Sequence, residues 1–208
     1  MKIHQIYKDY KIPQSLQEHM LRVAALAQII VEEWKDLQID KLSIVQTCLF
    51  HDIAKSMTFD LAKQKQFGML EEDIENLRKH QENLKSKYGK DEHLATVKIC
   101  EKIGLSKTSV KLVNNLEWSY IPRLINNKNI ESLIPIYCDM RIGPKGILSL
   151  KDRLDDLKNR VGMDNYQETL ENANKVEEII TQNIKTNINS ITDNQINLKF
   201  KELLNTKV

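Results

Sequence analysis

A histidine and an aspartate stand side by side inside an apolar run, Cys48-Leu49-Phe50-His51-Asp52-Ile53. Burying an unpaired carboxylate is costly, so a buried carboxylate is normally paired or bound to a metal. In a helix over this stretch, His51 and Asp52 lie on the same face as the apolar residues one turn before them. Both side chains are therefore expected to point into the fold. The pair therefore predicts a polar site inside the protein.

Two further polar residues lie on the apolar faces of other expected helices. His19 stands between Leu16 and Val23 at helical spacing, and Asp139 ends the apolar segment 130–140. In helical bundles, side chains that face one another from different helices build metal sites in the core. Two imidazoles and two carboxylates suit Mn²⁺, Fe²⁺, Co²⁺, Ni²⁺ or Zn²⁺ better than a structural zinc site, which would use thiolates.

Each of these residues taken alone has an ordinary structural explanation. His19 could be a core histidine with a hydrogen-bond partner, and Asp139 could pair with Arg141. Lys55 and Arg141 could be exposed cations at helix ends, where the helix dipole favours them. Taken together, two buried carboxylates would need separate cationic partners. The joint pattern therefore favours a metal site.

The rest of the sequence predicts the helices that position these residues. Only 6 Gly and 4 Pro occur in 208 residues, and good helix formers are frequent, so we expect an all-α protein. No segment has the alternating pattern of a strand. We expect turns at Gly68 and at residues 143–146. From apolar spacing and capping residues, the expected helices cover about 13–34, 40–55, 70–88, 91–103, 106–118, 130–140, 149–160 and 164 onward.

Composition and charge narrow the function classes. The net charge of +2 gives no reason to expect nucleic acid as the main partner. Three separate cysteines without a CxxC motif indicate buried free thiols in a reducing compartment. The first residues are polar, and no apolar run is long enough to span a bilayer. We therefore expect a cytoplasmic protein that does not enter the membrane.

The order of the polar residues resembles the HD superfamily of metal-dependent phosphohydrolases, whose signature is a His, a later His-Asp pair and a distant Asp, all on helices. Here Glu18-His19-Met-Leu-Arg22, Leu49-Phe-His51-Asp52 and Tyr137-Cys-Asp139-Met-Arg141 match its three elements. The resemblance covers about residues 13–145. It implies an HD-domain helical bundle, which we place at residues 1–148.

Residues 149–208 are expected to form a C-terminal helical extension. Its amphipathic helices could pack on the HD domain, cover the open end of the site, or contact another subunit in a homodimer. We identified no catalytic candidate among them.

The resemblance also implies the ligands of a divalent metal ion, whose identity among Mn, Fe, Co, Ni, Zn and Mg stays open. These ligands are His19, His51, Asp52 and Asp139.

Many family members have further histidines that bind a second metal or the substrate phosphate. His93 is the candidate for the first of these. No histidine stands near the expected place of the second, and Glu117 is the nearest replacement. Whether the site holds one metal or two therefore stays open.

The activity implied by the resemblance is hydrolysis of a phosphate ester or anhydride, with nucleotides as the commonest substrates. A bound divalent cation lowers the pKa of its water and polarises a phosphoryl oxygen. Asp52 is expected to orient that water or accept its proton, and Lys55 to bind the phosphate, with Arg22 and Arg141 as further phosphate-binding candidates. The alternatives are a metal-retaining nucleotide sensor with little turnover and a helical interaction protein with a relict motif.

Overall fold

A computed structural model describes residues 1–35, 38–66 and 69–208. Within these residues the chain is all-α, and its β-type pairings are isolated bridges only. The predicted fold class is therefore confirmed, whereas the turn expected at Gly68 lies outside the described residues. The helices are α1 (Ile3–Asp9), α2 (Gln14–Glu32), α3 (Lys41–Phe50), η1 (Lys55–Thr58), α4 (Leu61–Gln66), α5 (Glu71–Tyr88), α6 (Glu92–Lys102), α7 (Lys107–Asn114), η2 (Trp118–Tyr120), α8 (Ile121–Asn126), α9 (Ile130–Arg141), α10 (Leu150–Val161), α11 (Tyr166–Asn183), η3 (Ile188–Ser190) and α12 (Asp193–Asn205).

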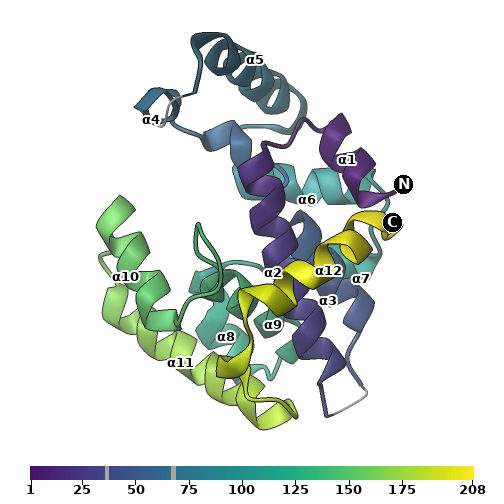
Figure 1. The fold of residues 1–208 in the computed structure, drawn as a ribbon, viewed down its shortest axis with the longest axis vertical. Coiled ribbons are helices and arrows are strands. Elements are labelled where there is room, and N and C mark those ends of the chain that lie inside the picture. Colours follow the sequence, from purple (N-terminus) through teal and green to yellow (C-terminus); the bar gives the residue numbers. More distant parts are fainter. Residues whose placement is uncertain (36–37, 67–68) are drawn as a thin grey trace.

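Helix α2 is the central element of the bundle (Figure 1) and packs against α3, α9 and α12. Its middle consists of small and branched apolar residues, and residues 23–27 are fully buried. A helix that is apolar on several sides is stable only when other elements surround it. The packing therefore holds α2, and His19 on it, in a fixed position within the core.

Helix α3 begins where the sequence predicted. The Asp40 side chain accepts a hydrogen bond from the backbone N–H of Ser43 at 3.0 Å, which is the usual role of an N-cap aspartate. Capping side chains likewise start three later helices at the expected residues, Asp91, Ser106 and Ser149.

Helix α3 ends at Phe50 and not near Lys55, so the expected length of this helix was wrong. The cause is local. The ring of His51 turns back and bonds the carbonyl oxygen of Cys48 through Nδ1 at 2.8 Å, and that carbonyl would otherwise accept from the backbone N–H of Asp52. Such side-chain bonds compete with the helix. His51 and Asp52 consequently stand in a tight turn before η1.

The C-terminal residues pack on the helices that precede them. α10 and α11 contact α9, and α12 runs along α2 and α1. The two chain ends lie side by side in Figure 1, where the amino group of Met1 donates to the carbonyl oxygen of Val208 at 3.0 Å. One apolar core extends from Ile3 to Leu203. Residues 149–208 therefore share a core with residues 1–148.

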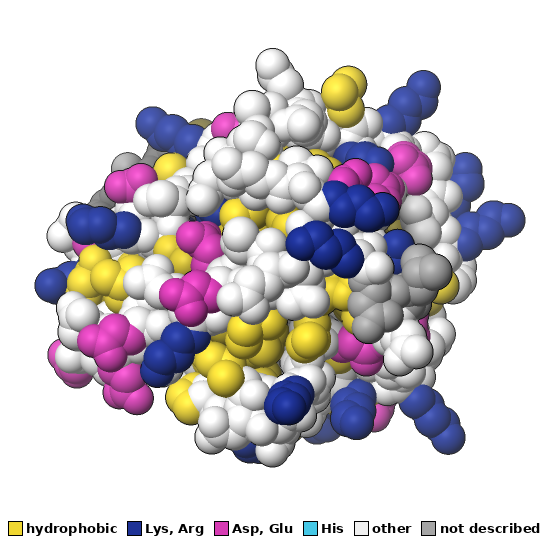
Figure 2. Space-filling model, turned by 90° about the horizontal axis from the view of Figure 1, so that it is seen from below, with side chains coloured by type: hydrophobic (Ala, Val, Ile, Leu, Met, Phe, Trp, Pro, Cys, Tyr) yellow, Lys and Arg dark blue, Asp and Glu magenta, His cyan; other side chains and the backbone are white. Residues whose placement is uncertain are grey.

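The described surface carries mixed charge. On the face shown in Figure 2, cationic and anionic side chains are interspersed around exposed apolar atoms. None of the described helices combines the length and the apolar character needed to cross a membrane. The cysteines Cys48, Cys100 and Cys138 are buried free thiols, as predicted.

Candidate metal centre

Two imidazoles and a carboxylate from distant parts of the chain meet at the centre of the bundle. Nε2 of His19 lies 3.1 Å from Oδ1 of Asp139, and Nε2 of His51 lies 3.6 Å from the same oxygen. The ligand atoms of these three residues all lie within 4.8 Å of one another. Oδ2 of Asp52 lies 3.9 Å from His19 Nε2 and 3.8 Å from His51 Nε2. The fold thus brings all four predicted ligand residues together.

The environment of His51 tests whether these residues fit a metal. Because Nδ1 faces the Cys48 carbonyl oxygen at 2.8 Å, Nδ1 carries the proton in the neutral ring, and Nε2 presents its lone pair to the cluster. Nε2 is buried, and in the described part of the chain it has no hydrogen-bond partner. A histidine held through one nitrogen with the other free is the usual arrangement of a metal ligand. The residues present therefore fit a divalent cation.

The electrostatics of the cluster agree with a cation site. Burial by itself would lower the pKa of His51, but the carboxylates of Asp52 and Asp139 outweigh it and raise the pKa to about 10. Burial would raise the pKa of Asp139, yet the neighbouring imidazoles of His19 and His51 hold it well below its usual range. Both shifts show that this site favours positive charge beside ionised carboxylates.

A tryptophan orients the carboxylate of Asp139. Nε1 of Trp118 donates to Oδ2 at 3.2 Å, which leaves Oδ1 facing the two histidines. Hydrogen bonds of this kind fix metal ligands and are a normal part of metal sites. From the sequence, Trp118 was expected only to stand at the end of a helix over about residues 106–118.

The cluster opens into a cavity of about 490 Å³. Side chains from six parts of the chain line it, among them the four residues of the cluster. Other side chains that line the cavity include Lys55, His93, Glu117, Trp118, Arg153 and Arg160.

The further site candidates His93 and Glu117 line this cavity as a pair. Nδ1 of His93 lies 3.3 Å from the Glu117 carboxylate, and Nε2 lies 3.2 Å from the carbonyl oxygen of Asn114. Among the described residues, this pair does not join a third ligand in a second metal-type cluster. The structure therefore places both residues at the cavity without building a second complete centre.

Lys55 also lines the cavity, whereas Arg22 does not. The amine of Lys55 lies 3.0 Å from the Glu92 carboxylate. Burial would lower the pKa of Lys55, but the carboxylates of Asp52 and Glu92 raise it, so the amine stays charged. Arg22 instead pairs with Glu18 on the same helix at 3.4 Å. Of these two expected phosphate contacts, only Lys55 therefore reaches the cavity.

The expectation that Arg141 binds phosphate is contradicted by its position. Arg141 is only 4% exposed, it lies outside the cavity lining, and its guanidinium is bonded within the fold through Nε and NH1. Nε donates to the carbonyl oxygen of Leu148 at 2.5 Å, and NH1 bonds the Tyr137 hydroxyl and the Glu177 carboxylate. Being two residues from Asp139, it sits on a different face of α9. Arg141 joins α9 to α11 and does not face the site.

Two arginines that were not predicted from the sequence line the cavity, where Arg22 and Arg141 had been expected. Arg153 and Arg160 on α10 line the cavity, and both pair with Asp156, at 3.2 and 2.7 Å. The three residues stand at steps of three and four, which puts them on one face of a helix. That spacing was the available signal, but an exposed charged helix shows the same pattern. No catalytic candidate was expected among residues 149–208, and the structure shows that α10 contributes two cationic side chains to the cavity lining.

Residues 16–102 match the family model of the HD domain. This match over part of the chain supports a protein of the HD superfamily. HD domains bind divalent metals, and members of this family are generally hydrolases. The matched segment holds His19 and the His51-Asp52 pair but ends before Asp139, which the fold brings to the same cluster. Searches of curated proteins and of solved structures found no match to the chain.

Proposed function

We propose that this protein is a metal-dependent phosphohydrolase that cleaves a phosphate ester or anhydride, with a nucleotide as the substrate class. The observation that carries this proposal is one cavity that combines the cluster with three cationic side chains, Lys55, Arg153 and Arg160. A divalent cation would be held by His19, His51, Asp52 and Asp139.

The charge of the side chains that line the cavity links binding of the substrate to binding of the metal. Besides its histidines, the lining has four carboxylates and three cations. A divalent cation in the cluster would add two positive charges beside these carboxylates, which favours a phosphate. We therefore expect phosphate compounds to bind more tightly when the metal is present. The carboxylates are Asp52, Glu92, Glu117 and Asp139, and the cations are Lys55, Arg153 and Arg160.

When bound, a divalent cation at this site would lower the pKa of a water molecule and polarise a phosphoryl oxygen. The side chain of Asp52 is 21% exposed and points its Oδ2 at both histidines. It is thus the carboxylate best placed to orient a water molecule on the cavity side and accept its proton. Asp139, bonded to His19 and Trp118, is fixed and serves as a ligand.

Lys55, Arg153 and Arg160 would bind the phosphoryl oxygens, because cations stabilise the charge of a transferring phosphoryl group. Nε of Arg153 is buried and without a hydrogen-bond partner among the described residues, so it can still bind an oxygen. Apolar walls formed by Trp118 and Leu157 line the same cavity and can receive the organic part of the substrate. Such a mixture of charged and aromatic groups suits a nucleotide.

The pair His93–Glu117 would contact the substrate in this proposal. Both nitrogens of His93 face oxygen acceptors, so the ring is held at the wall beside the cluster. The four cluster residues are sufficient for a single metal, and a second ion would need ligands beyond this pair.

Phosphate release from a panel of nucleotides, phosphomonoesters and phosphodiesters tests the proposal. We expect activity with at least one of Mn²⁺, Co²⁺, Ni²⁺ or Mg²⁺, and its loss on treatment with EDTA and return on adding metal. Metal-dependent nucleotide binding with no release from any compound would overturn hydrolysis and favour the metal-retaining sensor instead.

A further inference from the structure

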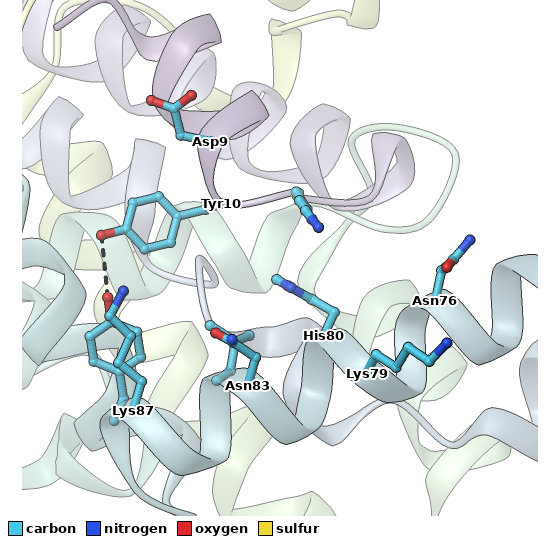
Figure 3. Close-up of a pocket in the computed structure, with 10 residues that line it drawn as sticks. Asp9, Tyr10, Asn76, Lys79, His80, Asn83 and Lys87 are labelled. Carbon is cyan, nitrogen blue, oxygen red and sulfur yellow. Dashed lines mark hydrogen bonds between the residues drawn. The ribbon is translucent and has the colours of Figure 1, made fainter.

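A second cavity of about 860 Å³ lies between the end of α1 and helix α5. It shares no lining residue with the cavity of the cluster. Its volume falls within the roughly 300–1,000 Å³ that small-molecule sites occupy. Figure 3 shows that Tyr10 bounds it on the α1 side, while His80 and Asn83 project from α5.

The charge in this second cavity is unbalanced. Three lysines, Lys11, Lys79 and Lys87, line it, against one carboxylate, Asp9. In the described chain no carboxylate lies within 4.0 Å of the amines of Lys11 and Lys87, and the amine of Lys79 is 3.8 Å from Glu75. Amines gathered around one cavity, two of them without a carboxylate partner among the described residues, favour an anionic ligand.

His80 adds an unsatisfied polar atom to these lysines. Its Nε2 is buried and has no hydrogen-bond partner within the described residues, although buried polar atoms normally have one. Burial and the charge of Lys11 lower the pKa of His80, so the ring is neutral at pH 7. Figure 3 places His80 between Lys79 and Lys87, with Asn83 beside it. This unsatisfied nitrogen belongs to a side chain that lines the cavity.

The backbone of Lys11 is held in an unusual conformation. Its φ of +51° lies in the left-handed region, which few residues other than glycine adopt. One residue in this conformation commonly ends a helix, and Lys11 follows the end of α1 in this way. Here the backbone bond from Ile12 N–H to the Tyr7 carbonyl oxygen, 3.0 Å, closes the turn. The turn thereby directs Lys11 to the cavity next to His80.

We propose that this cavity binds a small phosphate-bearing polyanion, separately from the metal centre. The amines of Lys11, Lys79 and Lys87 would neutralise its charge, since lysine binds phosphate as a point charge. His80 would donate through Nε2, with Asn76 and Asn83 able to bond further oxygens. Three amines against one carboxylate match a ligand with at least two negative charges.

Helix α5 links this cavity to the segment that carries Lys55. Gln81, adjacent to His80, is buried and donates from Nε2 to the carbonyl oxygens of Ser56 and Phe59, at 2.9 and 2.8 Å. These bonds hold η1 against α5. Occupation of the cavity is therefore expected to alter η1. Any effect of this ligand on hydrolysis would rest on the proposed function. Binding of the ligand and the change in η1 do not depend on that function.

Titration of the ¹⁵N-labelled full chain with inorganic pyrophosphate in EDTA, followed by NMR, tests this proposal without metal or turnover. The chain has 5 histidines, and His80→Gln assigns the relevant imidazole signal. We expect that signal, and the amide signals of Ser56 and Phe59, to shift saturably. A double variant, Lys79→Ala with Lys87→Ala, should weaken the apparent affinity at least tenfold. All these lysines are exposed, so the fold should be retained, as its spectrum will verify.

The matched control is Lys85→Ala, because Lys85 lies on the same helix but does not line the cavity. It should titrate like the wild type. An unchanged His80 signal at millimolar pyrophosphate, or equal affinity in the double variant and in Lys85→Ala, would overturn the site. Shifts of the His80 signal without any shift at Ser56 or Phe59 would overturn the link to η1.

Discussion

Asp52→Asn is expected to lower kcat for phosphate release by at least about 100-fold, because positioned acid–base groups contribute roughly 10²–10⁴-fold. Asparagine keeps the shape of the side chain but cannot accept a proton. The side chain of Asp52 is 21% exposed and lies 3.8 Å from Nε2 of His51, so the change removes charge at the reaction site and not packing. Initial rates at saturating metal and substrate measure this effect.

A matched change separates catalysis from general charge effects. Asp164 is exposed and lines none of the described cavities, so Asp164→Asn should retain wild-type activity. Melting temperature and metal content are to be measured for both variants. Wild-type kcat in Asp52→Asn, with metal bound, would exclude the role assigned to Asp52.

Arg141→Met is expected to destabilise the fold by about 1–3 kcal/mol, the usual cost of leaving buried polar groups without their hydrogen-bond partner. Met keeps much of the apolar length of the side chain, but the Glu177 carboxylate, 3.1 Å from NH1, loses its partner. The Leu148 carbonyl oxygen and the Tyr137 hydroxyl lose donors as well. Urea unfolding followed by circular dichroism measures the change.

Arg78→Met on the exposed side of α5 is the control, since surface substitutions usually change stability by less than about 0.5 kcal/mol. The two roles considered for Arg141 predict different results. A normal urea midpoint with a raised KM for the phosphate compound would show that Arg141 binds substrate after all. A lowered midpoint with unchanged KM supports the structural role.

The helices and the inward-facing residues could be predicted because local physics determines them. Apolar residues at three- and four-residue steps placed His19 in the core on α2, and the caps Asp40, Asp91 and Ser106 fixed helix starts. Local patterns also placed His51 and Asp52 facing inward. These features depend on residues that are close together in the sequence, so they can be recognised from one sequence alone.

The end of α3 and the cationic side of the site could not be predicted in the same way. The helix stops because the ring of His51 bonds the Cys48 carbonyl oxygen, an outcome that needs the ring orientation. Arg141 stands two residues from Asp139, but its partner Glu177 comes from α11. Arg153 and Arg160 reach the site only because α10 packs on α9. Long-range packing decides each of these cases.

Metal content of the purified chain, after loading with Mn²⁺ or Co²⁺ and removal of excess metal, tests the central claim most directly. Elemental analysis should find about one ion per wild-type chain and almost none in His51→Ala, which removes the unpaired Nε2 from the cluster. His4→Ala, which changes an exposed histidine, should keep the wild-type content. A wild-type chain that holds no metal, or a His51→Ala chain that holds as much as the wild type, would contradict the metal centre.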